Sequence, residues 1–296
     1  MTPIRLTTSL SLCMLLFACS RPEEKPTDDT TPNLLTGLSG SLTFHASFDK
    51  GPNADFGAGD LKLYSVGKSP KEVSEGTGTP PLQLDTASGN FKSALRFTKE
   101  NSHVVFYKAE KNITYSTESF HGTFSFWMST DPEEIPGQYC DPIQITDKDY
   151  SNAAIWVDIT KNDSPPDLRM GFFGDQPVWD VKNRKGESEE FFWRLHKVSL
   201  PPLGKGKWTH VAITWEGVND SKQGRARLYL NGELQGASGV IREPFTWDVT
   251  NTNVRLGTGN FIGLFDDIAA FNKALSAEEI RFLYQLKQGV AELNRQ

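Results

Sequence analysis

Aromatic side chains in two polar stretches of this 296-residue sequence are the residues best suited to contact a ligand. Trp179 and Trp193 flank a charged stretch and Tyr139 lies in a Pro-containing one, where no strand pattern requires a large ring. Exposed aromatic faces pack against the C–H surfaces of sugars, and nearby carboxylates accept hydrogen bonds from hydroxyl groups. We therefore predict a ligand site at these three residues, with Asp180 as a polar partner.

A glycosidase would also need two carboxylates at the spacing that catalysis requires. Glycosidases place two carboxyl groups on either side of the scissile bond, and within a strand such a pair occupies alternate positions. Asp147 and Asp149 have that spacing, but they lie in a polar stretch without alternating apolar residues, and Glu187, Glu189 and Glu190 lie in a charged one. The sequence also lacks G-x-S-x-G and H-E-x-x-H motifs. We expect no catalytic site.

The N-terminal residues predict export and lipid attachment. Arg5 precedes an apolar run over 10–18 that is too short to span a bilayer, which is typical of a signal peptide. The run ends in Leu16-Phe17-Ala18-Cys19, which resembles a bacterial lipobox, so Cys19 is the predicted lipidation site; the alternative is a plain secretory signal with an incidental cysteine. Ser20 and Arg21 follow Cys19, and there is no aspartate at these positions that would resemble an inner-membrane retention signal. We therefore expect a lipoprotein of the cell envelope, on the outer membrane.

Composition divides the chain into four segments. Residues 1–18 are the predicted signal peptide, and residues 19–38, rich in Pro, Thr and acidic side chains, are a predicted flexible tether. A single domain over 39–288 and a tail over 289–296 follow. Cys140 would then be the only thiol besides Cys19 in the mature chain, which excludes an intrachain disulfide within the domain. The net charge of −6 argues against nucleic acid as a partner and against membrane contact other than through the lipid anchor.

Two strands and a tight turn are predicted between residues 207 and 236. Residues 208–215 alternate between two faces, as a pleated strand requires, and residues 225–230 form a second alternating run. Asn231-Gly232 follows at once and favours a type I′ turn, in which both central residues have positive φ. We expect a β-hairpin that reverses the chain at Glu233.

This hairpin, with its W-T-H-V-A and L-Y-L-N-G segments, resembles the LamG-like jelly roll of the concanavalin A-like lectin/glucanase superfamily. Further segments resemble the family in the same order: LTFHASFD (42–49), SALRF (93–97), TFSFWMS (123–129), VRLG (254–257), GLFDDIAAF (263–271) and ALSAEEIRFLY (274–284). The resemblance implies an all-β fold, a concanavalin A-like jelly-roll β-sandwich of two antiparallel sheets. The last segment contains the capping box Ser276-Ala-Glu-Glu279, which predicts a short C-terminal helix.

The resemblance also implies classes of ligand. Relatives with this fold often hold Ca²⁺, and Asp49, Asp266 and Asp267 could meet where the terminal strands lie side by side. The function that we expect is non-catalytic binding of carbohydrate or another extracellular ligand, such as a protein. The alternatives are a structural or adhesion protein without a small-ligand site, and a glycoside hydrolase of the same superfamily.

Overall fold

The structure is a computed structural model that describes residues 31–67, 72–77, 82–101, 103–161, 166–182, 188–221 and 223–295. The predicted signal peptide, the lipidation site Cys19 and residues 20–30 of the predicted tether lie outside these residues. Within the described ranges, no helix combines the length and the hydrophobicity that crossing a bilayer requires.

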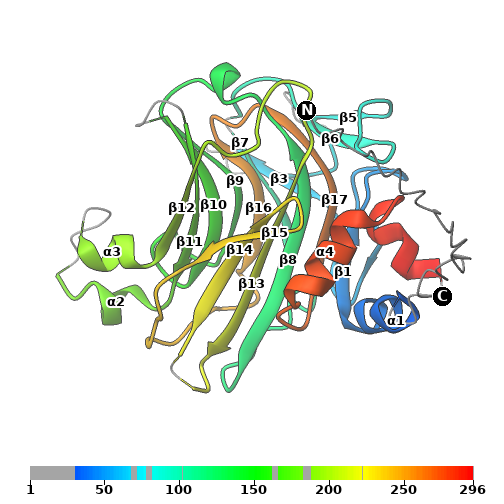
Figure 1. Cartoon of the computed structure of the whole chain (residues 1–296). Helices are drawn as coiled ribbons and strands as arrows, with labels where there is room; N and C mark the ends of the chain where they lie inside the picture. Colours follow the sequence, from blue (N-terminus) through cyan, green and yellow to red (C-terminus); the bar gives the residue numbers. More distant parts are fainter. Residues whose placement is uncertain are drawn as a thin grey trace, which may run out of the picture.

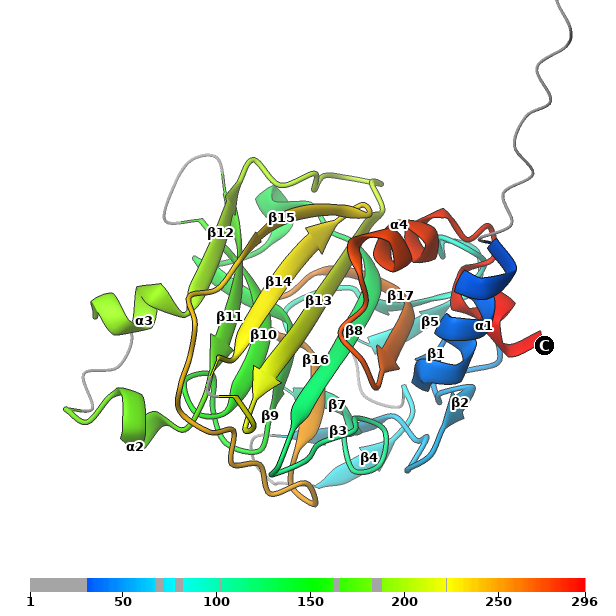
Figure 2. The ribbon, with the colours of Figure 1, turned by 60° about the horizontal axis from the view of Figure 1, so that its bottom comes forward.

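The strands form two antiparallel sheets, which confirms the predicted sandwich (Figures 1 and 2). Sheet A contains, in spatial order, β15 (Glu233–Ala237), β14 (Arg225–Leu230), β13 (Thr209–Val218), β8 (Phe120–Ser129), β17 (Gly263–Phe271), β1 (Leu42–Ala46) and β2 (Phe56–Gly57), while β6 (Ala94–Phe97) pairs with both β17 and β5 (Leu82–Asp85). Sheet B contains β12 (Leu195–Ser199), β11 (Asp167–Phe173), β10 (Ala154–Thr160), β9 (Tyr139–Thr146), β16 (Asn253–Gly259), β7 (His103–Lys108), β3 (Tyr64–Gly67) and β4 (Val73–Glu75). The helices are α1 (Thr31–Ser41), α2 (Gln176–Trp179), α3 (Glu189–Trp193) and α4 (Ala277–Gln285), with 3₁₀ turns η1 (Pro132–Glu134) and η2 (Gly289–Arg295).

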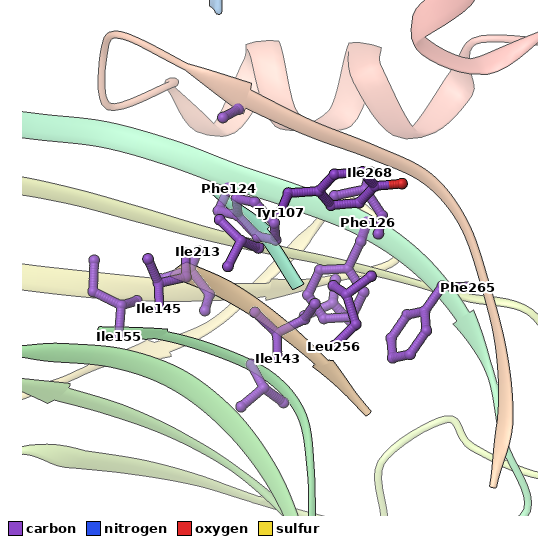
Figure 3. Close-up of a cluster of buried hydrophobic side chains, with 14 of the residues drawn as sticks. Tyr107, Phe124, Phe126, Ile143, Ile145, Ile155, Ile213, Leu256, Phe265 and Ile268 are labelled. Atoms are coloured by element: carbon purple, nitrogen blue, oxygen red, sulfur yellow. The ribbon is translucent and has the colours of Figure 1, made fainter. Parts of the chain in front are cut away.

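Alternate residues of the central strands fill the space between the sheets. Phe124, Phe126 and Ile213 of sheet A belong to the same buried cluster as Ile143 and Ile145 of sheet B (Figure 3). Removing such a side chain from water stabilises a fold by roughly 1.5–3 kcal/mol. This inward set fixes which residues of each strand point to the outer faces.

The predicted hairpin is confirmed. Leu230 pairs with Glu233, and the two residues between them have φ of 50° at Asn231 and 81° at Gly232. Both values lie in the left-handed region, as a type I′ turn requires. The His210 N–H also donates a hydrogen bond of 2.9 Å to Asn231 Oδ1, which links the turn to β13.

Helices α1 and α4 and the 3₁₀ turn η2 cover the outer face of sheet A (Figure 1). The predicted capping box of α4 is confirmed, because Ser276 and Glu279 exchange both side chain–backbone hydrogen bonds. The tether assignment is wrong for residues 31–38, which form α1 and bury Leu38 completely. The predicted tail is likewise part of the fold, since Leu293 of η2 is fully buried in the same cluster.

Candidate functional site

A β-bulge interrupts the pairing of β9 with β10 in sheet B. Val157 of β10 pairs with Ile143 of β9, and Ile159 pairs with Cys140, so two residues of β9, Asp141 and Pro142, lie opposite Asp158 alone. A bulge tolerates proline because one residue of the bulged strand is left outside the ladder. The extra residue keeps Cys140 and Ile143 in the core and sends Asp141 to the outer face.

The outer face of sheet B contains a cavity of about 310 Å³, hereafter the sheet B cavity. Its residues occupy positions that alternate with core residues: Trp156 and Asp158 lie between buried isoleucine and valine residues of β10, and Arg169 lies between Leu168 and Met170. The described residues that line it are Tyr139, Asp141, Tyr150, Trp156, Asp158, Arg169 and Phe191. Four rings and three charged groups therefore converge in one hollow.

The charged groups of the cavity form a connected set. Arg169 Nε donates a hydrogen bond of 2.9 Å to Asp158 Oδ1, and Arg169 Nη2 donates to Asp158 Oδ2, which makes the pair bidentate. The guanidinium carbon also lies 5.8 Å from the centre of the Tyr139 ring. From the neighbouring strand β16, Thr258 Oγ1 donates a hydrogen bond of 3.2 Å to Asp141 Oδ2.

Burial alters the protonation of both carboxyl groups. Burial, and then the negative charge of Asp158, raise the pKa of Asp141 to about 6, although Thr258 and Arg169 act in the opposite direction. Burial also raises the pKa of Asp158, against the stabilising effect of Arg169. Asp141 thus changes charge close to neutral pH, a property found often at functional sites.

The aromatic residues form the floor and the rim of the cavity. The Trp156 indole stacks on Phe173 with ring centres 5.7 Å apart and donates a hydrogen bond of 2.7 Å from Nε1 to the Tyr150 carbonyl oxygen. It lies so close to Gly171 that a Cβ atom there would come within 2.1 Å of the ring. Tyr139 and Tyr150 are 46% and 40% exposed, so their faces are accessible to a ligand.

Helices α2 and α3 support one wall of the cavity. Trp179 is only 8% exposed, packs with Phe173 and Phe191, and donates a hydrogen bond of 3.1 Å from Nε1 to the Ser151 carbonyl oxygen. The Arg194 guanidinium lies over the Trp179 ring and forms an ion pair of 2.7 Å with Glu243, with both partners buried. These contacts hold Phe191 in place at the cavity.

Of the predicted ligand-binding residues, the structure places Tyr139 alone in the sheet B cavity. Trp179 lies behind the wall, and Asp180 is buried next to it. Trp193 is 59% exposed and lines a separate hollow of about 350 Å³, where its Nε1 donates a hydrogen bond of 3.0 Å to the Val240 carbonyl oxygen. Ligand contacts by these residues remain predictions.

The predicted metal-binding residues serve as hydrogen-bond acceptors. Asp49 and Asp266 accept bonds of 3.0 Å from the backbone N–H groups of Ser93 and Phe91, so the two carboxylates do approach one short segment. Asp267 accepts a bond of 2.9 Å from the Val290 N–H, and its other oxygen lies 2.7 Å from His45 Nε2. Among the described residues, no group of three or more His, Cys, Asp or Glu side chains is arranged to hold a metal ion. Calcium binding stays a prediction.

Two residues with reactive side chains are buried, one between the sheets and one on the outer face of sheet A. Cys140 is buried, and burial raises the pKa of its thiol well above the ordinary value. His210 is buried on the outer side of sheet A, where its Nε2 lies 2.8 Å from Ser125 Oγ, and burial lowers its pKa to about 3. Both are therefore neutral at physiological pH.

Most of the cavity was not predicted, because the polar stretch that contains Tyr139 shows no regular strand pattern in the sequence. That stretch nevertheless forms β9 (Tyr139–Thr146) in the middle of sheet B. On the neighbouring strand β10, Trp156 lies on the face opposite Ile155 and Val157. A signal was present in the alternation itself, which sets Trp156 and Asp158 apart from the apolar face.

Comparisons with known proteins support the architecture. The family profile described as the concanavalin A-like lectin/glucanases superfamily matches residues 99–281. Domain 4 of AbnA, a GH43 extracellular arabinanase from Geobacillus stearothermophilus, is similar with 18% identity and a TM-score of 0.52 over 83% of this chain and 98% of that chain. The binding domain of Paraclostridial Mosquitocidal Protein 1 is 15% identical, with a TM-score of 0.48 over 83% of this chain and 52% of that chain. No curated protein matches.

The similarity to domain 4 of AbnA shows the fold alone, because the sequence identity is low. The family match, by contrast, spans more than half of this chain and includes β8, the bulged strand β9, the hairpin and β17. The chain belongs to the concanavalin A-like lectin/glucanases superfamily.

Proposed function

We propose that the protein binds carbohydrate in the sheet B cavity and does not catalyse a reaction there. The observation that carries the proposal is the convergence of four aromatic residues with a carboxylate and a bidentate ion pair in one accessible hollow. Sugar rings present apolar C–H faces to aromatic residues and hydroxyl groups to polar residues. The aromatic and the charged side chains of the cavity can therefore both contact a sugar.

The choice of carbohydrate is supported by one structure of the same fold. Domain 4 of AbnA was solved in complex with arabinotriose. An oligosaccharide is therefore the ligand class with which we begin, and the cavity of about 310 Å³ has room for about one or two sugar residues at a time.

A glycan array with the domain from residue 31 onward tests the proposal. Wild type should bind a subset of glycans, and Tyr150→Ala should weaken that binding about fivefold, because one ring contact contributes about 1 kcal/mol. Phe56→Ala, which removes an exposed ring from β2 of sheet A, is the matched control and should bind like wild type. Equal binding by all three proteins, or none by wild type, would contradict the proposal.

The carboxyl pair at the bulge favours one second candidate, a glycoside hydrolase. Asp141 has a raised pKa beside the ion-paired Asp158, and two carboxyl groups whose environments differ are the usual acid and nucleophile of such enzymes. Release of reducing ends from a bound oligosaccharide, lost in Asp141→Asn, would identify the protein as an enzyme. Binding without release supports the non-catalytic proposal.

We further propose that Cys19 anchors the protein to the cell envelope, at the outer membrane. The lipobox-like Leu16-Phe17-Ala18-Cys19 supports this location. Cys19→Ser should abolish labelling by a radioactive fatty acid and leave the protein unprocessed or soluble. Retention in the membrane with an unchanged mass would argue against the anchor.

A further inference from the structure

The sheet B cavity contains an imbalance of charge. Among the described residues, its lining has two carboxylates, Asp141 and Asp158, and one guanidinium, that of Arg169. Both hydrogen bonds from Arg169 go to Asp158, so that pair is neutral as a unit. Asp141 is left as the uncompensated charge whenever it is ionised.

Cations on the neighbouring elements are committed to other partners. Arg255 of β16 donates to Gln144 Oε1 at 2.7 Å and to the Lys148 carbonyl oxygen at 3.1 Å. Lys197 of β12 pairs with Asp167 at 3.0 Å. On the far side of the wall, Arg194 pairs with Glu243 at 2.7 Å. Within the described parts of the chain, Asp141 therefore forms no ion pair of its own.

Asp141 also has an oxygen that is free to accept a hydrogen bond. Its Oδ2 accepts from Thr258, whereas Oδ1 accepts no hydrogen bond from any described residue. The groups that face this carboxyl are Asp158 from β10, Arg169 from β11, Tyr139 from its own strand and Tyr150 from the loop after β9. A ligand in the cavity, which Tyr139 and Tyr150 also line, can therefore supply the missing donor.

We propose that the sugar bound in the sheet B cavity carries a primary ammonium group, as in oligomers of a deacetylated hexosamine, and that this group pairs with Asp141. This inference rests on the proposed carbohydrate-binding function. An ammonium donates to Oδ1, balances the second carboxylate and is attracted to the faces of Tyr139 and Tyr150. A uronic acid would bring a third carboxylate next to Asp141 and Asp158, which repel it.

Calorimetry with three oligosaccharides of equal length tests the inference. The ligands are the hexamers of glucosamine, N-acetylglucosamine and galacturonic acid, measured at about pH 7, above the pKa of Asp141, with EDTA present to remove divalent cations. Wild type should bind the glucosamine hexamer about tenfold more tightly than the acetylated one, as expected for one charge-assisted hydrogen bond, and should bind the galacturonic acid hexamer most weakly.

Two variants complete the experiment. Asp141→Asn should bind the amino and acetylated hexamers equally, and thermal unfolding establishes that it is folded. Glu278→Gln removes one exposed negative charge from α4, over the other sheet, and should keep the wild-type preference. Equal affinity of wild type for the amino and acetylated hexamers, or preference for galacturonate, would overturn the inference and leave carbohydrate binding intact. Failure to bind any glycan on the array or any of these hexamers would overturn both.

Discussion

Asp141 lies at the proposed binding site, and its ionised carboxylate lowers the stability of the folded protein. Its carboxyl has a pKa of about 6 in the folded protein and an ordinary value of 3.8 in the unfolded chain. The native state therefore holds this proton more tightly, and between these pH values stability falls as the pH rises. We predict that Asp141→Asn stabilises the protein by about 1–2 kcal/mol at neutral pH, less than full linkage because the cavity admits water.

Urea unfolding at two pH values checks this prediction. The variant should exceed wild type in unfolding free energy at about pH 7.5 and match it at about pH 3, where the unfolded carboxyl is also protonated. An equal gain at both pH values would mean that ionisation is not its cause. A stabilising substitution at a ligand-binding position would also agree with the general conflict between stability and function.

Gly171 determines the position of the cavity floor. A Cβ atom at this position would lie 2.1 Å from the Trp156 indole, so Gly171→Ala must displace the ring from the sheet. We expect a loss of about 1–3 kcal/mol in unfolding free energy, as for other overpacked sites, together with weaker glycan binding. Gly40→Ala is the matched control, because nothing lies within 4 Å of a Cβ there and the residue is in α1, where alanine is favourable. Unchanged stability of Gly171→Ala would show that Trp156 has room to move.

Among the elements, the β14–β15 hairpin allows a direct test of turn chemistry. Gly232 has φ of 81°, and a Cβ atom there would lie 3.1 Å from the Tyr284 ring of α4. Gly232→Val should therefore lower the unfolding free energy by about 1 kcal/mol or more. Asn231→Asp keeps the acceptor for the His210 N–H and should change the melting temperature little. A valine variant as stable as wild type would contradict the assigned turn.

The segment carrying α2 and α3 gives its two tryptophans different roles. Trp179→Ala should lower the unfolding free energy by about 3 kcal/mol, since the indole packs in a buried cluster. Trp193→Ala, on the same segment, loses an exposed ring and one hydrogen bond and should cost about 1 kcal/mol. Chemical denaturation of both variants measures these losses in unfolding free energy. Equal losses would contradict the different roles assigned to the two tryptophans.

The same elements show what could be predicted from the sequence. Strands with uninterrupted alternation, such as β13 and β14, were predicted, and so was α4, whose capping box is a local signal. Strand β9 was missed because Pro142 and the bulge interrupt its period of two. Helix α1 was missed because its stability comes from α4 and η2, which lie about 240 residues further along the chain. Strand β9 supplies Tyr139 and Asp141 to the candidate site, and Asp141 was missed with that strand.

At the scale of the whole molecule, the outer faces of the two sheets differ in how they are covered. Sheet A is covered by an apolar layer of α1, α4 and η2, and Tyr284 of α4 stacks on Trp127 with ring centres 5.5 Å apart. Sheet B keeps an accessible cavity, with Phe191 of α3 in its lining. Helices α2 and α3 lie beside the β11–β12 side of this sheet (Figure 2). A mixed aromatic and charged surface is therefore accessible to a ligand on sheet B, on the side opposite the helical layer.

This arrangement predicts that the helical layer serves stability and the sheet B cavity serves binding. A chain that begins at residue 42 lacks α1 and uncovers Leu42 and Leu293, which Leu38 and the hydrogen bond from Ser39 Oγ to the Leu293 carbonyl oxygen help to protect. We expect it to lose about 2–5 kcal/mol in unfolding free energy relative to a chain that begins at residue 31, comparable to the loss of a large buried side chain. Below its lower melting temperature it should bind glycans with the same affinity, because α1 lies over the other sheet. Equal melting temperatures would mean that α1 adds nothing to the fold, and weakened binding in the folded, shortened chain would mean that the two faces are coupled.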